Sequence, residues 1–283
     1  MRLTTIDDLI NNPARSCHRE YLLTTRFISD VVLAAGHAGY DLLIYLPTVD
    51  SDGFDIILDD RHRLVPLQLK SAVAGGKAAF WSVHKTLLWP DVDDADLYGL
   101  DQNWSQHGRS GGVVLVRAAV RDGELTPHYA YTDINVLAAL WYEVWPLPVA
   151  QRKGIDRLQA ELSDDSKLKI DLPRSAFLPV ATTDHLLALA GLTANVEDDW
   201  RSSLRTALRS RKNGVPYGDL DPDLRRWAYR DLQRLVCKPT EPQPPRNARE
   251  KGRQALRAID QTLYRMDRLA ELNKNDLKKS RKK

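Results

Sequence analysis

Three residues whose side chains could act in hydrolysis lie close together in the stretch "FDIILDDRHRLVPLQLKSA". They are Asp55, Gln68 and Lys70. A carboxylate and an amide oxygen are hard oxygen donors, the type of ligand that Mg²⁺ and Mn²⁺ prefer. A lysine beside such an ion could orient an attacking water or stabilise the charge on a phosphate. These residue types therefore point to a metal-assisted hydrolytic site.

The local pattern predicts how the chain would bring these side chains together. Side chains alternate between the two faces of a strand, so Gln68 and Lys70 point one way and the neighbouring leucines point the other way. A hairpin would place Asp55 beside Gln68, and the main-chain carbonyl of Leu69 could add a third oxygen ligand. The alternative is an edge strand whose polar residues face water. Pro66 favours this alternative, because proline avoids the interior of central strands, although it could equally begin the strand.

A long helix and a series of strands are expected around this stretch. Residues 16–35 have the pattern of a helix, because Leu23, Phe27 and Val31 follow helical spacing. Apolar and β-branched runs separated by short turns predict strands, at residues 41–47, 54–60, 64–71, 111–120 and 128–134. This part of the chain is thus expected to form an α/β fold, with a mixed β-sheet and flanking helices.

Glu20 is a further candidate ligand on the predicted helix. It lies three residues before Leu23 and seven before Phe27, on the stripe that should face the sheet. The alternative is that this acid only stabilises the positive end of the helix dipole near the helix start.

Asp55, followed by Gln68, Leu69 and Lys70 at the end of a strand, resembles the PD-(D/E)XK nuclease superfamily. The expected order of a helix and three strands agrees with this resemblance. It implies a restriction-endonuclease-like core and a metal-dependent phosphodiesterase that acts on nucleic acid, with DNA as the expected substrate. It also implies that Asp55, Gln68, the Leu69 carbonyl and Glu20 bind Mg²⁺ or Mn²⁺, and that Lys70 assists hydrolysis. A Q-x-K form of the motif occurs in Mrr-like restriction enzymes and in families associated with phage defence.

Two departures from the superfamily pattern bear on the site. The proline of the proline–aspartate pair is absent, since Phe54 precedes Asp55, and Gln68 replaces the acidic residue of the tripeptide. An amide carries no negative charge, so Gln68 should hold a divalent ion less strongly than a glutamate would. Glu20 therefore becomes more important as a ligand. The resemblance covers residues 16–145.

Other basic residues are weaker candidates for contacts with phosphate. His84 and Lys85 lie a short way past the site. Residues 201–212 and 225–234 are dense in arginine, which neutralises phosphates in sequence-independent binding. Interspersed acids make an ordinary solvated face an equal alternative for both segments.

Composition and charge narrow the class of protein. The chain has 283 residues, of which 43% are hydrophobic and 28% charged, as in soluble globular proteins. No apolar run is long enough to cross a membrane, no secretory signal is visible, and the two cysteines form no metal-binding motif. These features predict a cytoplasmic protein. The net charge is only +3, but residues 246–283 carry 13 Lys and Arg against 5 Asp and Glu, which indicates either a polyanionic partner or a solubilising tail.

Three regions are expected along the chain. Residues 1–150 would form the nuclease-like α/β domain, residues 151–240 a helical module, and residues 241–283 a proline-rich linker with a basic amphipathic tail helix. The apolar stripe of the tail would pack either on the helical module or on a second copy of the chain, which would create a homodimer.

The leading hypothesis is thus a metal-dependent nuclease, and the resemblance alone implies a role in bacterial anti-phage defence or restriction. Two other hypotheses stay open. One is a nuclease fold without activity that binds nucleic acid, and the other is an assembly subunit whose tail contacts a partner. Each is compatible with a regulatory partner protein.

Overall fold

The computed structural model describes residues 5–47, 53–73, 78–100, 108–121, 123–164, 166–192, 199–210 and 220–236. The chain divides into two compact units, Met1–Lys238 and Pro239–Lys283. The second unit, which contains the expected tail helix, lies outside the described residues. The expected domain boundary at residue 150 falls inside the first unit.

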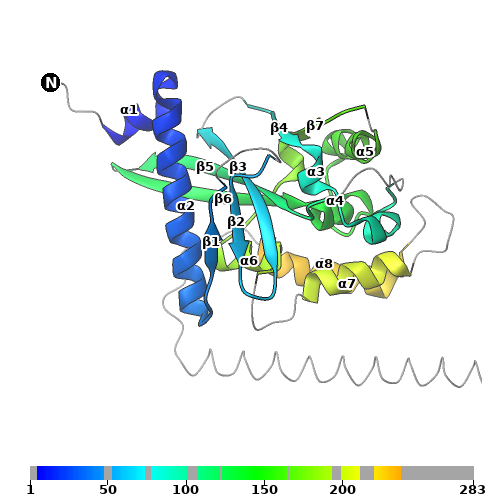
Figure 1. Cartoon of the computed structure of the whole chain (residues 1–283). Helices are drawn as coiled ribbons and strands as arrows, with labels where there is room; N and C mark the ends of the chain where they lie inside the picture. The colour runs from blue at the N-terminus through cyan, green and yellow to red at the C-terminus, as the bar shows by residue number, and fades with distance from the viewer. Residues whose placement is uncertain are drawn as a thin grey trace, which may run out of the picture. The chain divides into compact units, whose positions relative to one another are not determined.

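A mixed six-stranded β-sheet forms the centre of the first unit, as Figure 1 shows. Its strand order is β1-β2-β3-β5-β6-β8, and β3 pairs antiparallel with β2 and parallel with β5. β4 and β7 form a separate two-stranded sheet. The strands are Leu43–Tyr45 (β1), Ile56–Asp59 (β2), Leu64–Val73 (β3), Phe80–His84 (β4), Gly112–Arg121 (β5), Glu124–Asp133 (β6), Lys169–Pro173 (β7) and Leu178–Pro179 (β8). The mixed α/β class expected from the sequence is confirmed.

Helices flank the sheets. Those expected between residues 151 and 240 are present, but this region also contributes β7, which pairs with β4, and β8, which pairs with β6. The region is therefore not purely helical. No helix among the described residues has the length and apolar character needed to span a membrane. The α-helices are Ile6–Asn11 (α1), Ser16–Ala38 (α2), Lys85–Leu88 (α3), Ile134–Trp141 (α4), Val149–Ser163 (α5), Thr183–Ala190 (α6), Asp199–Arg209 (α7) and Pro222–Val236 (α8).

The long helix α2 packs against the sheet through the stripe that the sequence predicted. Leu23 and Phe27 are buried, and the Phe27 ring meets the Tyr129 ring of β6 edge to face, with centroids 5.6 Å apart. The Tyr129 hydroxyl donates a hydrogen bond to Asp30 of α2, with a distance of 2.7 Å. The helix ends at Gly39, which adopts a left-handed conformation with φ of 85° that glycine tolerates best.

The strand register assigns side chains to the two faces of the sheet. Tyr129 pairs with Val116 of β5, and Val116 pairs with Ser71 of β3. Partners across strands point to the same face, so these three residues lie on the face that α2 covers, here called the α2 face. Gln68 and Lys70 are an odd number of residues before Ser71. Strand alternation therefore assigns them to the other face, here called the opposite face.

A buried ion pair ties α7 to the end of β6. Arg201 donates to the Asp133 carboxylate, and both side chains are almost fully buried. Asp133 also accepts hydrogen bonds from the Tyr131 hydroxyl, at 3.1 Å, and from the Val136 backbone N–H at the start of α4, at 2.8 Å. The Arg201 guanidinium also donates to the Leu189 carbonyl, at 2.8 Å. Arg201, one of the arginines considered for phosphate contacts, is thus a structural residue.

Candidate active site

A cavity of about 470 Å³ brings together the residues singled out in the sequence. It lies between α2, the chain just before β2, and strands β3, β4 and β5. Its lining also includes Ser71 and Trp81. The predicted site residues that line it are Glu20, Asp55, Gln68, Leu69 and Lys70.

The cavity lies where β3 continues beyond the end of its neighbour β2. The pairing of β2 with β3 ends at Ile56 and Leu67, whereas β3 runs on to Val73. On this free edge, one oxygen of the Asp55 carboxylate accepts a hydrogen bond from the Leu69 backbone N–H, at 2.7 Å. The Asp55 backbone N–H in turn donates to the Leu67 carbonyl, at 2.8 Å. The two bonds fix the carboxylate beside β3.

The same geometry places the Leu69 carbonyl. In an extended strand, the N–H and the C=O of one residue point to the same side of the strand. Because the Leu69 N–H points toward Asp55, the Leu69 carbonyl also points toward the free edge. A carboxylate and a main-chain carbonyl therefore face the same side of β3, which is the ligand pair that the sequence had suggested.

Gln68 is the most buried of the candidate ligands. Its side chain is only 8% exposed, and its Oε1 atom has no hydrogen-bond partner among the described residues. A buried polar atom without a partner costs about 1 to 3 kcal/mol of stability. A bound ion or water at Oε1 would offset this cost. The unpartnered amide oxygen therefore fits a ligand site, and so does the donor set of carboxylate, amide and carbonyl oxygens.

The alternative in which Gln68 faces water is wrong, because Gln68 is only 8% exposed, although β3 has a free edge beyond Leu67. Pro66, which had favoured it, is placed where its missing N–H is tolerated. The pairing of β3 with β5 begins one residue later, at Leu67. Gln68 is thus buried inside the sheet.

The turn before β2 approaches the site closely. Gly53, which lies in this turn, has a φ of 76°, in the left-handed region that glycine tolerates best. A side chain there would put its Cβ 2.5 Å from the Cβ of His84 and 3.8 Å from Nε2 of Gln68. The turn can lie against His84, and so beside Gln68, only because residue 53 lacks a side chain. Asp50 and Asp52 fall outside the described residues.

Glu20 reaches the cavity from the other side of the sheet. It is an exposed residue on α2, and α2 covers the α2 face, whereas Gln68 and Lys70 belong to the opposite face. All of these residues nevertheless line the same cavity, at the free edge of β3. Asp55 lies at that edge, where its carboxylate accepts a hydrogen bond from the Leu69 backbone N–H.

The site offers few charged ligands. Within the described ranges, no group of three or more His, Cys, Asp and Glu residues is arranged to hold a metal ion. The cavity lining contains two carboxylates, Glu20 and Asp55, and one cation, Lys70. A metal ion here would depend on the Gln68 amide and the Leu69 carbonyl for its remaining protein ligands.

Two further candidates for phosphate contacts have structural roles. Lys85 is 1% exposed, and its Nζ donates to the Asp164 carbonyl at 2.9 Å and lies 5.1 Å from the Trp89 ring centroid. The Nδ1 atom of His84 is 2.7 Å from the Thr86 hydroxyl. Lys85 is therefore too deeply buried to contact a substrate phosphate.

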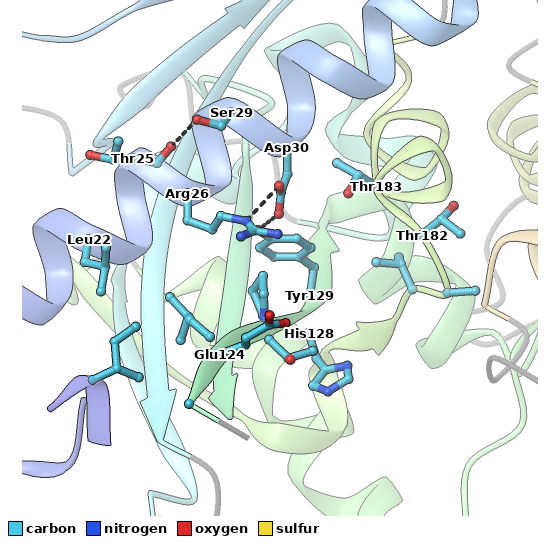
Figure 2. Close-up of a pocket in the computed structure, with 17 residues that line it drawn as sticks. Leu22, Thr25, Arg26, Ser29, Asp30, Glu124, His128, Tyr129, Thr182 and Thr183 are labelled. Carbon is cyan, nitrogen blue, oxygen red and sulfur yellow. Dashed lines mark hydrogen bonds and ion pairs between the residues drawn. The ribbon is translucent and has the colours of Figure 1, made fainter. Parts of the chain in front are cut away.

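A second and larger cavity, of about 770 Å³, was not foreseen from the sequence and appears in Figure 2. The Arg26 guanidinium donates to Asp30 at 2.9 Å, and Asp30 accepts from Tyr129 as well. Burial and this hydrogen bond raise the pKa of Tyr129. Arg26, Asp30 and Tyr129 thus satisfy one another, and the first cavity remains the stronger candidate.

Comparisons of the chain with family models, with curated proteins and with solved structures found no match. The function has to be argued from the geometry of the site.

Proposed function

We propose that the protein is a metal-dependent nuclease that hydrolyses phosphodiester bonds in DNA. The observation that supports this most is the shared cavity at the free edge of β3. Residues from α2, from the turn before β2 and from β3 meet there, and Gln68, the most buried of the candidate ligands, has an unpartnered amide oxygen. If Gln68 had only a structural role, its buried amide oxygen would still lack a hydrogen-bond partner.

Each residue has a role that its position supports. Asp55, Gln68 and the Leu69 carbonyl would hold Mg²⁺ or Mn²⁺ at the free edge, and Glu20 would add the second negative charge. Such an ion, when bound, supplies Lewis acidity to the phosphate and lowers the pKa of a bound water. Lys70 would orient the attacking water or stabilise the negative charge that develops on the phosphate.

The fold supports the proposal at a finer level as well. The order α2, β1, β2, β3 is the helix followed by three strands on which the resemblance to the PD-(D/E)XK superfamily rests. The core would accordingly be restriction-endonuclease-like. A cytoplasmic role in bacterial anti-phage defence follows from the same resemblance, and a regulatory partner protein is compatible with that role.

A second candidate is a protein that binds nucleic acid without cutting it. The small number of carboxylates in the cavity favours it, because an amide in place of an acid weakens metal binding. An assembly subunit remains the third hypothesis.

Incubation of the full chain with plasmid, linear and single-stranded DNA and with RNA, in Mg²⁺, Mn²⁺ or EDTA, tests the proposal. Cleavage of DNA that requires the metal and is lost in a Lys70→Ala variant would support it. Metal-independent cleavage, or cleavage that survives Lys70→Ala, would contradict it. Binding of DNA without cleavage would favour the second candidate.

A further inference from the structure

The end of the β5–β6 hairpin exposes one face of the sheet next to the cavity. Both α1 and α2 contact β5, and α2 covers the α2 face. Figure 2 shows the Tyr129 ring directed toward α2 and the His128 ring directed away from Arg26 and Asp30. His128 therefore lies on the opposite face, where it is exposed.

The basic residues on this face, Lys70, Arg117 and His128, lie in consecutive strands of the sheet. Arg117 of β5 pairs with Ala72 of β3 on one side and with His128 of β6 on the other. Lys70 is two residues before Ala72 and shares its face. The Cα atoms of Lys70 and Arg117 are therefore separated by about 8 Å, one strand across and two residues along. Arg117 and His128 are direct partners, with Cα atoms about 5 Å apart.

We propose that these three residues form a track for the phosphate backbone of duplex DNA, leading from the cavity across the opposite face of the sheet. The proposal rests on the proposed nuclease function and adds to it the surface that holds the substrate. The positive charge of the track favours the negatively charged phosphate backbone as its ligand, since Arg117 is exposed and Lys70 lines the cavity. Arginine and lysine supply most of the affinity of proteins for nucleic acid phosphates.

The side chains around Arg117 favour a duplex over a single strand. Its neighbours on the same face include Ala72, Ala119 and Thr126, all small and half-buried. Proteins that bind single strands usually offer aromatic rings on which bases stack, and these positions offer none. Small side chains between Lys70 and Arg117 leave space for the phosphate backbone of a duplex, in which the bases are already stacked on one another. Glu124, exposed at the hairpin turn, would mark the outer limit of the track.

Fluorescence anisotropy with a labelled duplex and the matching single strand, in EDTA and over a range of salt concentrations, tests the track without any cleavage. The Arg117→Glu variant should bind the duplex at least about 10-fold more weakly. For each lost phosphate contact, the slope of log K against log salt should fall by about 0.9. Lys153→Glu on α5 is the matched control, because Lys153 is exposed, lies outside the arginine-dense segments, and its change alters the net charge equally. Circular dichroism would verify that both variants are folded.

The outcomes separate this inference from the proposed function. Equal weakening by Arg117→Glu and Lys153→Glu would show only an effect of net charge and would overturn the track. Binding of the single strand alone, or no binding of DNA by the wild type, would also overturn it. Selective loss with Arg117→Glu in a protein that never cleaves DNA would support the track and refute the nuclease.

Discussion

The carboxylate of Asp55 accepts a hydrogen bond from the Leu69 backbone N–H across the free edge of β3, at 2.7 Å. Asp55 therefore has a structural role besides its proposed role as a ligand, and two substitutions separate them. Asp55→Asn keeps an acceptor oxygen and removes the charge, so it should abolish cleavage with little change in stability. Asp55→Ala should abolish cleavage and also cost about 1 to 2 kcal/mol, because the bond to a charged acceptor is lost at a half-buried site. Urea unfolding and the DNA-cleavage assay measure both effects. Full activity in Asp55→Asn would remove Asp55 from the metal site.

Lys70→Ala should abolish cleavage and leave the fold intact, because Lys70 is only half-buried and lines the cavity from the middle of a long strand. Lys169→Ala is the matched control, since Lys169 is an exposed lysine on β7. Single-turnover cleavage rates and thermal unfolding would be measured for both variants. A Lys70→Ala protein that cuts at the wild-type rate would mean that Lys70 has no part in the reaction.

The burial of Gln68 gives opposite expectations for two substitutions. Gln68→Glu restores a carboxylate and should keep or strengthen binding of Mn²⁺, measured by calorimetric titration. Gln68→Met removes the ligand and should weaken Mn²⁺ binding. In the absence of metal it should leave stability unchanged or raised, because it removes a buried amide oxygen that lacks a partner. If Gln68→Met destabilises the metal-free protein by several kcal/mol, the amide is a structural group.

The sequence was sufficient to predict those helices and strands whose burial pattern is visible in the local spacing of apolar residues. The spacing of Leu23 and Phe27 predicted the buried side of α2, and the run around Gln68 predicted β3. The helix predicted for residues 16–35 extends to Ala38 in the structure and ends at Gly39, where the backbone is left-handed. Local pattern contains this information because burial and backbone conformation at these positions depend on neighbours close in sequence.

Elements that depend on a partner far away in the sequence could not be predicted from local spacing. β8 has only two residues, and it is a strand because β6 lies beside it. β7 likewise depends on β4. The periodicity of α2 predicts that one side is buried, but it does not say which face of the sheet that side meets. For this reason the position of Glu20 relative to Gln68 emerged only from the register of β3, β5 and β6.

Removal of one partner of the ion pair between Arg201 and Asp133 should strongly destabilise the first unit. Arg201→Ala leaves a buried carboxylate uncompensated and should cost about 3 to 5 kcal/mol, whereas the exposed Arg226→Ala should change stability by less than about 0.5 kcal/mol.

Urea unfolding followed by fluorescence would measure this cost and would also test the expected boundary at residue 150. A single transition that moves as a whole would indicate that the helices after residue 150 unfold together with the sheet, and two separate transitions would indicate independent domains.

The basic tail, which lies outside the described residues, should contribute to binding through its charge alone. Deletion of residues 246–283 should reduce the salt dependence of DNA binding, since the segment carries 13 Lys and Arg against 5 Asp and Glu. Light scattering on the full and the shortened chain tests the homodimer expected from its apolar stripe. A dimer that becomes a monomer on deletion would make the tail a dimerisation segment, and a monomer throughout would exclude that role.

The chain order of β6, β8 and Arg201 has a consequence for synthesis on the ribosome. The β5–β6 hairpin joins neighbouring residues and can form as soon as it emerges. The strand that pairs with Ala130 and Tyr131 at the outer edge of β6 follows at Leu178–Pro179, and the arginine that neutralises Asp133 comes later still. During this interval the nascent chain exposes an uncovered strand edge, which is a template for aggregation. Chains truncated between residues 133 and 201 should therefore depend on chaperones for their solubility, while the complete first unit should not.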